Sequence, residues 1–231
     1  MLNIVLTDNR VSGKCTEALL TLGYAAVRLP SFKGLSSPVA SHPDMLCMKL
    51  RDGSLLITEE YYFSEKNFFD KLGVPVRTTE EKLVPEYPGD ILFDALAVNG
   101  RVYGKKGFVS RYILRENEVL VPVRQGYARC SVAMLSERCA VTSDRGLASV
   151  LSEDGISVLL IRSGYIRLDG YNTGFIGGAG GRLRGGVYCF FGDLMGHPDG
   201  KAILDFAADN KISAVSLSDE PLSDYGGLVL L

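Results

Sequence analysis

The sequence of 231 residues lacks several features that would assign a protein to a class at once. Its charges almost cancel, with 25 Lys and Arg against 27 Asp and Glu, so no basic field points to nucleic acid or to an anionic membrane. No stretch reaches the roughly 20 apolar residues that span a bilayer, and the apolar run at the N-terminus is too short for a signal-peptide core. The five cysteines are an odd number, which argues against a fully paired disulfide framework and for a reducing compartment. We therefore expect a soluble, cytoplasmic protein with no nucleic-acid partner and no membrane partner.

Motifs for metals and nucleotides are also absent. The chain has only two histidines, His42 and His197, and no CxxC or HExxH spacing, so we predict no metal site. The glycine-rich run FIGGAGG at 175–181 leads through RLRGG into another strand, whereas a nucleotide site needs a helix after its glycines. The run is better interpreted as a close-packed core strand, and we expect no cofactor.

A repeated pattern runs along the whole chain. Five segments have helical apolar spacing and end on Gly or Asn, and each is followed by a strand rich in β-branched residues. A short apolar strand precedes each helix, and in four cases another strand precedes that one through a tight turn. The turns Arg51-Asp52-Gly53 and Asn99-Gly100 are strong hairpin signals. The five helical segments are 15–23, 64–73, 108–117, 143–155 and 201–210.

The fifth unit lacks its second strand, and the N-terminal strand 3–8 can supply it. The residues that directly precede the first strand of each unit are Asp44, Asp90, Cys130, Gly174 and Gly227. They lie at intervals of 46, 40, 44 and 53, and 231 residues divided by five give about 46. The pattern predicts an α/β protein (α+β by composition) whose residues 1–231 form a single domain of five strand–strand–helix–strand units. An irregular α+β domain is the alternative.

This pattern resembles the pentein fold, the α/β propeller of the guanidino-group-modifying enzymes. The resemblance implies a five-bladed, pseudo-symmetric propeller that is closed by pairing of the N- and C-terminal strands. Such closure removes exposed sheet edges. The pattern is similar in the same way to the ribosome anti-association factor of eukaryotes and archaea, which shares the propeller.

In such a propeller the start of each first strand faces a central channel. The segments at those positions gather polar, ionisable and aromatic side chains, which is typical of a site for a small molecule. The segments are 41–44 (SHPD), 87–90 (YPGD), 127–130 (YARC), 171–174 (YNTG) and 223–227 (SDYGG). The candidate ligand-binding residues are Asp90, Tyr87, Tyr127, Arg129, Tyr171, Asn172, Thr173, Asp224 and Tyr225.

Three residues are candidates for catalysis, namely Cys130, His42 and Asp44. A neighbouring Arg129 could activate Cys130 as a nucleophile, although an intracellular cysteine is commonly an inert core residue. His42 has the residue type for proton transfer, and Asp44 with Asp90 could hold a guanidinium or ammonium group. Turn formation is the alternative explanation for His42, Asp44 and Asp90.

The catalytic residues that the resemblance implies are missing. Penteins use a cysteine after a glycine pair in the fifth unit and a histidine in the third unit. Here Leu228, Val229 and Leu230 follow Gly226-Gly227, and the third-unit strand contains no histidine. Two functions remain open: a small, cationic molecule bound in the channel, with a divergent hydrolase as its catalytic form, or a non-catalytic module that binds a protein or the ribosome.

Overall fold

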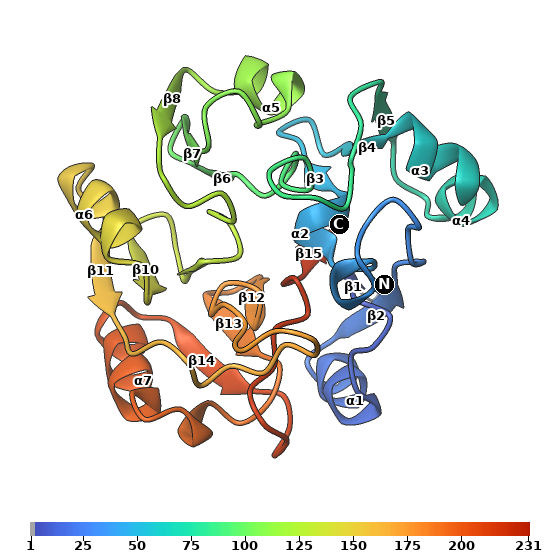
Figure 1. Cartoon of the computed structure of the whole chain (residues 1–231). Helices are drawn as coiled ribbons and strands as arrows, with labels where there is room; N and C mark the ends of the chain where they lie inside the picture. The colour runs from blue at the N-terminus through green and yellow to red at the C-terminus, as the bar shows by residue number, and fades with distance from the viewer. Residues whose placement is uncertain (1–2) are drawn as a thin grey trace.

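The computed structural model describes residues 3–231. It consists of five three-stranded sheets, each with one or two helices beside it (Figure 1). The first sheet combines β15 (Val229–Leu230), β1 (Asn3–Thr7) and β2 (Tyr24–Arg28), with α1 (Gly13–Thr21). The second contains β3 (Met48–Lys49), β4 (Leu55–Thr58) and β5 (Val76–Thr79), with α3 (Glu59–Ser64) and α4 (Lys66–Lys71).

The other three sheets follow in chain order. The third contains β6 (Leu96–Val98), β7 (Arg101–Gly104) and β8 (Val119–Pro122), with α5 (Arg111–Glu116). The fourth contains β9 (Val132–Met134), β10 (Cys139–Thr142) and β11 (Ser157–Leu160), with α6 (Arg145–Glu153). The fifth contains β12 (Gly180–Leu183), β13 (Val187–Phe190) and β14 (Ser213–Ser216), with α7 (Gly200–Asp209).

All five sheets have the same topology. The middle strand pairs antiparallel with one neighbour and parallel with the other, and the helix forms the parallel crossover, as the sequence pattern predicts. In the first sheet the antiparallel pair is β1 with β15, so strands from the two ends of the chain lie side by side. Within residues 3–231 the strands stay in five separate sheets, and no sheet closes on itself.

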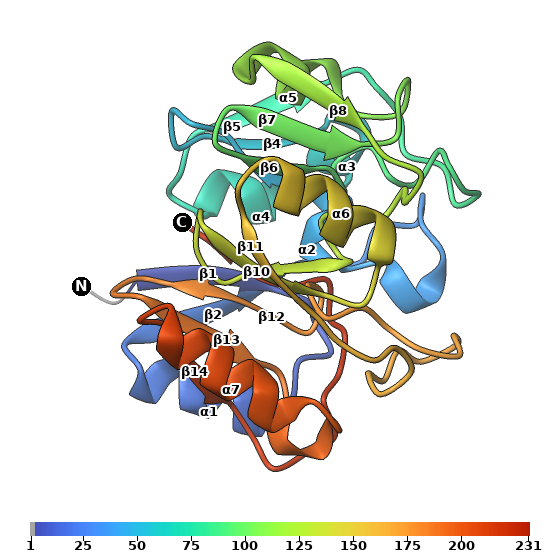
Figure 2. The same cartoon turned by 90° about the vertical axis from the view of Figure 1, so that its left-hand side faces the viewer.

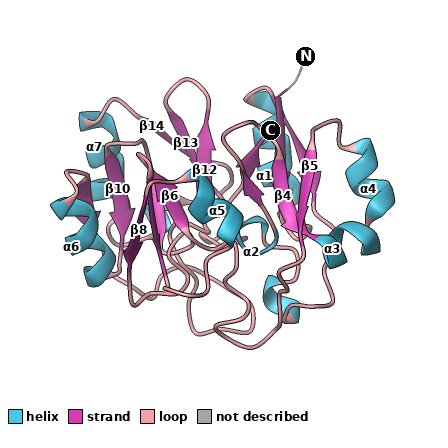
Figure 3. Ribbon diagram, turned by 90° about the horizontal axis from the view of Figure 1, so that it is seen from above, coloured by secondary structure: helices cyan, strands magenta, loops and turns pink. Residues whose placement is uncertain are grey.

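Helices α1 and α3 to α7 lie on the outside and the sheets face a common centre (Figure 1). From the side, the strands of the different units run in roughly similar directions (Figure 2). The hairpin turns therefore gather at one end of the strands and the long loops at the other (Figure 3). These loops carry most of the polar residues discussed below. No helix within residues 3–231 has both the length and the apolar character that a bilayer crossing requires.

Local sequence signals explain most of the elements. Ser12 caps α1 by accepting from the Cys15 amide, and Asp144 caps α6 by accepting from the Leu147 amide. Asn99 and Gly100 both adopt positive φ, at 51° and 78°, as a type I′ turn between β6 and β7 requires.

Three predicted strands differ from the structure, and the one expected from residue 91 begins only at Leu96, as β6. Residues 45 and 46, expected to begin a strand, instead end the short helix α2 (Pro43–Leu46), because Pro43 is preorganised for the first helical turn. Residues 174–179 are irregular, and β12 begins only at Gly180. At Gly177 a Cβ atom would lie 2.5 Å from the carbonyl oxygens of Arg129, Cys130 and Val132, so glycine permits this close approach.

Candidate functional site

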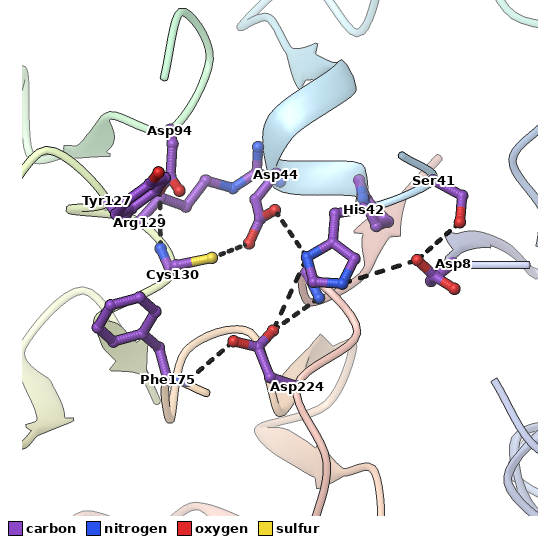
Figure 4. A network of polar contacts seen from close by, with 12 residues as sticks. Asp8, Ser41, His42, Asp44, Asp94, Tyr127, Arg129, Cys130, Phe175 and Asp224 are labelled. Carbon is purple, nitrogen blue, oxygen red and sulfur yellow. Dashed lines mark hydrogen bonds and ion pairs between the residues drawn. The ribbon is translucent and has the colours of Figure 1, made fainter. Parts of the chain in front are cut away.

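Helix α2 and three loops bring buried polar side chains to the centre of the molecule (Figure 4). Asp44 belongs to α2, and the loops that precede β6, β9 and β15 carry Asp94, Cys130 and Asp224, one residue from each. Asp8 follows β1, and His42 immediately precedes α2. Every one of these side chains is at least nine-tenths buried. We call these six residues the central cluster: Asp8, His42, Asp44, Asp94, Cys130 and Asp224.

Cys130 contacts two carboxylates of the cluster. Its Sγ atom lies 2.6 Å from Oδ2 of Asp44 and donates a hydrogen bond to it. Its backbone amide donates to Oδ1 of Asp94 over 2.9 Å. The other oxygens, Asp44 Oδ1 and Asp94 Oδ2, have no hydrogen-bond partner among the described residues.

His42 lies among three carboxylates. Its Nε2 atom is 3.7 Å from Asp8 Oδ2, while its Nδ1 atom is 3.9 Å from Asp44 Oδ1 and 4.0 Å from Asp224 Oδ1. Nε2 is buried without a hydrogen-bond partner within residues 3–231. The ring is therefore close to possible proton acceptors but is not held by any of them at hydrogen-bond distance.

Asp8 and Asp224 are the best anchored carboxylates. Asp8 accepts two side-chain hydrogen bonds from Arg10, at 2.7 and 2.8 Å, and one from Ser41 at 2.7 Å. Asp224 accepts from the backbone amides of Phe175 and Gly226, at 2.8 and 2.9 Å. These contacts fix both carboxylates before any ligand is present.

Burial controls the protonation of the cluster. It raises the pKa of Asp44 and of Asp94, against the opposing positive charge of Arg129. It raises the pKa of Asp224 to about 6, although the neighbouring His42 opposes the shift. Burial also lowers the pKa of His42, against the charges of Asp224 and Asp8. His42 is thus mostly uncharged at neutral pH and does little to neutralise the carboxylates around it.

The thiol of Cys130 is not activated in this environment. Burial raises its pKa well above the ordinary value, and the negative charges of Asp44, Asp94 and Asp224 raise it further. Arg129, which was expected to favour the thiolate, instead donates from Nη1 to the carbonyl oxygen of Cys47 over 2.8 Å. A thiolate at this position therefore needs an added positive charge.

Asp8 is the one carboxylate of the cluster with the opposite shift. Burial alone would raise its pKa, but the hydrogen bonds from Arg10 and the charge of His42 outweigh burial and lower it. Asp8 is therefore an ionised, internally paired carboxylate. Asp44 and Asp94 are left as the poorly compensated ones.

Asp90 belongs to an aromatic group beside the cluster. The Tyr127 hydroxyl donates to Asp90 Oδ2 over 2.6 Å, and the Tyr127 ring lies between Tyr87 and Phe175 with centroids 5.5 and 6.0 Å away. Lys105 donates to the Tyr87 hydroxyl over 3.2 Å and lies over its ring. Asp90 Oδ1 is buried without a partner in the described part of the chain.

The remaining candidates lie farther out. Tyr171 is 52% exposed, and its hydroxyl is 3.5 Å from that of Ser36; Asn172 is also exposed. The Thr173 hydroxyl donates to backbone carbonyl oxygens, a structural contact. Tyr225 packs edge-on against Phe191. The structure therefore brings Cys130, His42, Asp44 and Asp224 together but leaves these four residues outside the cluster.

A cavity of about 660 Å³ extends from the centre toward the hairpin turns. Asp44 and Arg129 lie on its wall together with the glycines of both core segments, including Gly177 and Gly226. Basic side chains, among them Lys49 and Arg182, also line it. This volume falls in the range of small-molecule sites.

Sequence reasoning missed two members of the cluster. Asp94 lies four residues after Asp90, the residue selected by the repeat spacing, and it is Asp94 whose carboxylate contacts Cys130. Asp8 directly follows the first strand. Its position after a buried parallel strand was the available signal, because such strand ends meet at one edge of a fold.

Comparison with solved structures supports the pentein resemblance at the level of the fold. The chain is similar to dimethylarginine dimethylaminohydrolase solved as an adduct with S-methyl-L-thiocitrulline, at 13% identity and a TM-score of 0.56, with 95% of this chain and 93% of that chain covered. It is similar to the Pseudomonas aeruginosa enzyme complexed with citrulline, at 10% identity and 0.51, with the same coverage. It is also similar to a putative arginine deiminase from Porphyromonas gingivalis, at 13% identity and 0.53, with 99% and 84% covered.

Sequence comparison gives a family for almost the whole chain. No curated protein matches it. A family model matches residues 6–229, however, and so covers all six members of the central cluster. The chain therefore belongs to DUF6873, a family of unknown function.

Proposed function

We propose that this chain is a divergent pentein-like protein that binds a small cationic molecule, carrying a guanidino or amino group, at the central cluster. In this proposal residues 1–231 form one domain, a propeller of five units of about 46 residues whose terminal strands close the ring. The cavity of about 660 Å³ that reaches Asp44 receives the ligand.

One observation carries the proposal: buried carboxylates at the centre outnumber the cations that could neutralise them. Asp44, Asp94 and Asp224 all have raised pKa values because of burial, and Arg129 is the nearby cation. Burying a charge without a partner is costly, so a cationic ligand would recover that cost. Charge-assisted hydrogen bonds to the unpartnered oxygens Asp44 Oδ1 and Asp94 Oδ2 would supply specificity.

A hydrolase is the catalytic form of this proposal, and the contact between Cys130 and Asp44 favours it. A bound guanidino cation would lower the pKa of the thiol, and Asp44 would take its proton as the sulfur attacks the guanidino carbon. His42, 3.9 Å from Asp44, would pass that proton to the nitrogen that leaves as an amine when its C–N bond breaks, and water would then cleave the C–S bond and restore the thiol. The other candidate is a non-catalytic propeller that binds a protein or the ribosome.

The test measures binding of matched cationic and neutral ligands to the full chain by calorimetry and thermal shift. Guanidino and amino compounds are compared with their uncharged ureido analogues. A ligand at 100 times its Kd should stabilise the protein by about 2.7 kcal/mol. Asp44→Asn and Asp224→Asn should weaken binding of the cationic ligands, while Asp205→Asn on the exposed face of α7 should not.

Equal binding of neutral and cationic ligands would contradict the proposal, as would binding that Asp44→Asn leaves unchanged. If no compound of either class binds, the non-catalytic module becomes the better explanation. Product formation from a bound guanidino compound, lost in Cys130→Ala, would distinguish the hydrolase from a simple binding protein.

A further inference from the structure

Three side chains from three separate segments meet at one corner of the central cluster. Asp44, Asp94 and Cys130 each contribute one oxygen or sulfur atom, and these three atoms all lie within 4.8 Å of one another. The residues are 2%, 1% and 4% exposed, so this group is enclosed rather than a chance gathering on the surface. Figure 4 shows the three side chains converging from helix α2 and from two loops.

The orientation of these groups leaves ligand atoms free. The Cys130 amide holds Asp94 by Oδ1, and Asp94 Oδ2 has no hydrogen-bond partner among residues 3–231. The Asp44 oxygen that does not receive the thiol is also buried without a partner in that range. Buried polar atoms are nearly always satisfied, so two such oxygens beside one thiol point to an additional ligand.

We propose that Asp44, Asp94 and Cys130 form a binding site for a divalent cation of the Zn²⁺ type. A cysteine sulfur selects a borderline or soft metal over Mg²⁺ and Ca²⁺, which prefer oxygen ligands alone. Two carboxylates and a thiolate carry three negative charges, which a divalent ion and the guanidinium of Arg129 together neutralise. A guanidinium that is bound without reacting, in contrast, gives no role to the sulfur.

The observed spacing requires only a small adjustment. Ligand atoms around tetrahedral zinc lie about 3.4–3.6 Å apart, given Zn–S and Zn–O bonds of about 2.3 and 2.1 Å. Cys130 Sγ and Asp44 Oδ2 are 2.6 Å apart and share a proton, so they must separate by about 1 Å as the metal replaces that proton.

The site has three protein ligands and an open fourth position. Asp44 lines the cavity of about 660 Å³, so that position is available to water or to a ligand in the cavity. Three protein ligands with one exchangeable position are typical of catalytic rather than structural zinc sites. Sequence motifs do not reveal such a site because its ligands come from three segments without local spacing.

This inference goes beyond the proposed function, since it requires no organic ligand. The two proposals share Asp44 and Asp94, and we therefore expect Zn²⁺ to weaken the binding of an organic cation. They differ in the other residues: the metal needs the Cys130 sulfur as a ligand, whereas binding of the organic cation does not, and Asp224, which lies on the side of His42, belongs to the organic cation's site alone. Separate substitutions can consequently test them one at a time.

The experiment titrates the metal-free full chain with Co²⁺ and then with Zn²⁺. One equivalent of Co²⁺ should produce the near-ultraviolet absorption of a cobalt–thiolate bond, and Zn²⁺ should displace it. Cys130→Ala should abolish that absorption, and Asp94→Asn should weaken Zn²⁺ binding by at least about tenfold. Cys189→Ala is the matched control, because Cys189 is also fully buried but lies away from the carboxylates.

The absence of a cobalt–thiolate absorption, or an unchanged one in Cys130→Ala, would overturn the metal site. Circular dichroism and urea unfolding establish that each variant is folded, and the isosteric Asp94→Asn provides a second variant should Cys130→Ala be unstable. If Cys130→Ala still binds a guanidino compound while losing the metal, the two proposals stand separately. If Asp224→Asn loses the organic cation alone, the metal site remains intact.

Discussion

The sulfur of Cys130 lies 2.6 Å from a carboxylate oxygen of Asp44, although 86 residues separate them in the sequence. The two groups share one proton, because a thiolate and a carboxylate would repel each other at this distance. The residue chosen as a nucleophile and the residue chosen as a cation ligand thus form one buried, neutralised pair. Every test of the site has to begin from this pair.

Cys130 should react slowly with alkylating reagents in the native protein. Burial and the negative charge of Asp44 both raise the pKa of its thiol, so little thiolate is present at neutral pH. Asp44→Asn removes that charge and should speed the alkylation of Cys130, as measured by mass spectrometry of the labelled peptide. Cys189, whose pKa burial raises to about 12, should keep its slow rate in both proteins. Rapid labelling of Cys130 in the wild type would contradict this view of the pair.

Asp224→Asn should change the pH dependence of stability. The folded pKa of Asp224 is raised to about 6 by burial, from an ordinary 3.8, so the folded state holds the proton more tightly than the unfolded chain. Asp224 therefore makes its largest contribution to the free energy of unfolding below about pH 4. That contribution falls as the pH rises to about 6, by up to about 3 kcal/mol. The asparagine of the variant does not titrate, so the variant does not lose this contribution. Its free energy of unfolding relative to that of the wild type should therefore increase between about pH 4 and pH 6.

Urea unfolding at pH 4 and pH 6.5 measures this difference. The variant also loses one backbone hydrogen bond, because an amide has a single oxygen to accept from Phe175 and Gly226, but that cost does not depend on pH. His42 has a lowered pKa and makes stability rise with pH, which is why the two proteins are compared with each other. A constant difference across the window would show that Asp224 does not titrate there.

Gly226→Ala should disturb the site more than its backbone strain explains. Gly226 has φ of 68°, and an added Cβ would lie 2.4 Å from the His42 Cβ and 2.7 Å from Asp44 Oδ1. Gly53→Ala is the matched control, since Gly53 has φ of 85° and nothing within 4 Å. Both should lose about 1 kcal/mol or more from the unfavourable φ, and Gly226→Ala should lose about 1–3 kcal/mol further. Equal destabilisation of the two variants would mean that the side chains of His42 and Asp44 move away from the added methyl group at little cost in free energy.

Arg10→Gln should lower stability at neutral pH and less so in acid. The hydrogen bonds from Arg10 lower the pKa of the buried Asp8 despite the opposing effect of burial. The contribution of these hydrogen bonds to the free energy of unfolding is fully present above 3.8, the ordinary pKa of an aspartate. It is lost as the pH falls through the lower pKa that Asp8 has in the folded protein. Because the Arg10 side chain is 34% exposed, we expect a loss of about 1–2 kcal/mol at pH 7. Thermal unfolding at pH 7 and pH 3 measures the destabilisation caused by Arg10→Gln. A destabilisation that is larger at pH 3 than at pH 7 would contradict the lowering of the Asp8 pKa by Arg10.

Much of the architecture was predictable because it depends on local chemistry. Helical spacing, capping residues and the Asn99-Gly100 turn act over a few residues, and the structure has five helix–strand units where the pattern places them. The same reasoning placed Asp44 and Cys130 at equivalent points of the units and put His42 and Asp224 in the segments that face the centre. It was less accurate within the loops, where it did not select Asp94 and expected a strand at residues 45–46.

The sequence by itself determined the order of the elements and the family resemblance, because backbone propensity and apolar periodicity are written along the chain. Only the tertiary structure decided which polar groups touch: Asp94 rather than Asp90 at Cys130, and Asp44 rather than Arg129 at its thiol. Those contacts join loops from different units, and their distances depend on how all five sheets pack. Burial, which controls the protonation of the whole cluster, is likewise a property of the packed molecule and of no single segment.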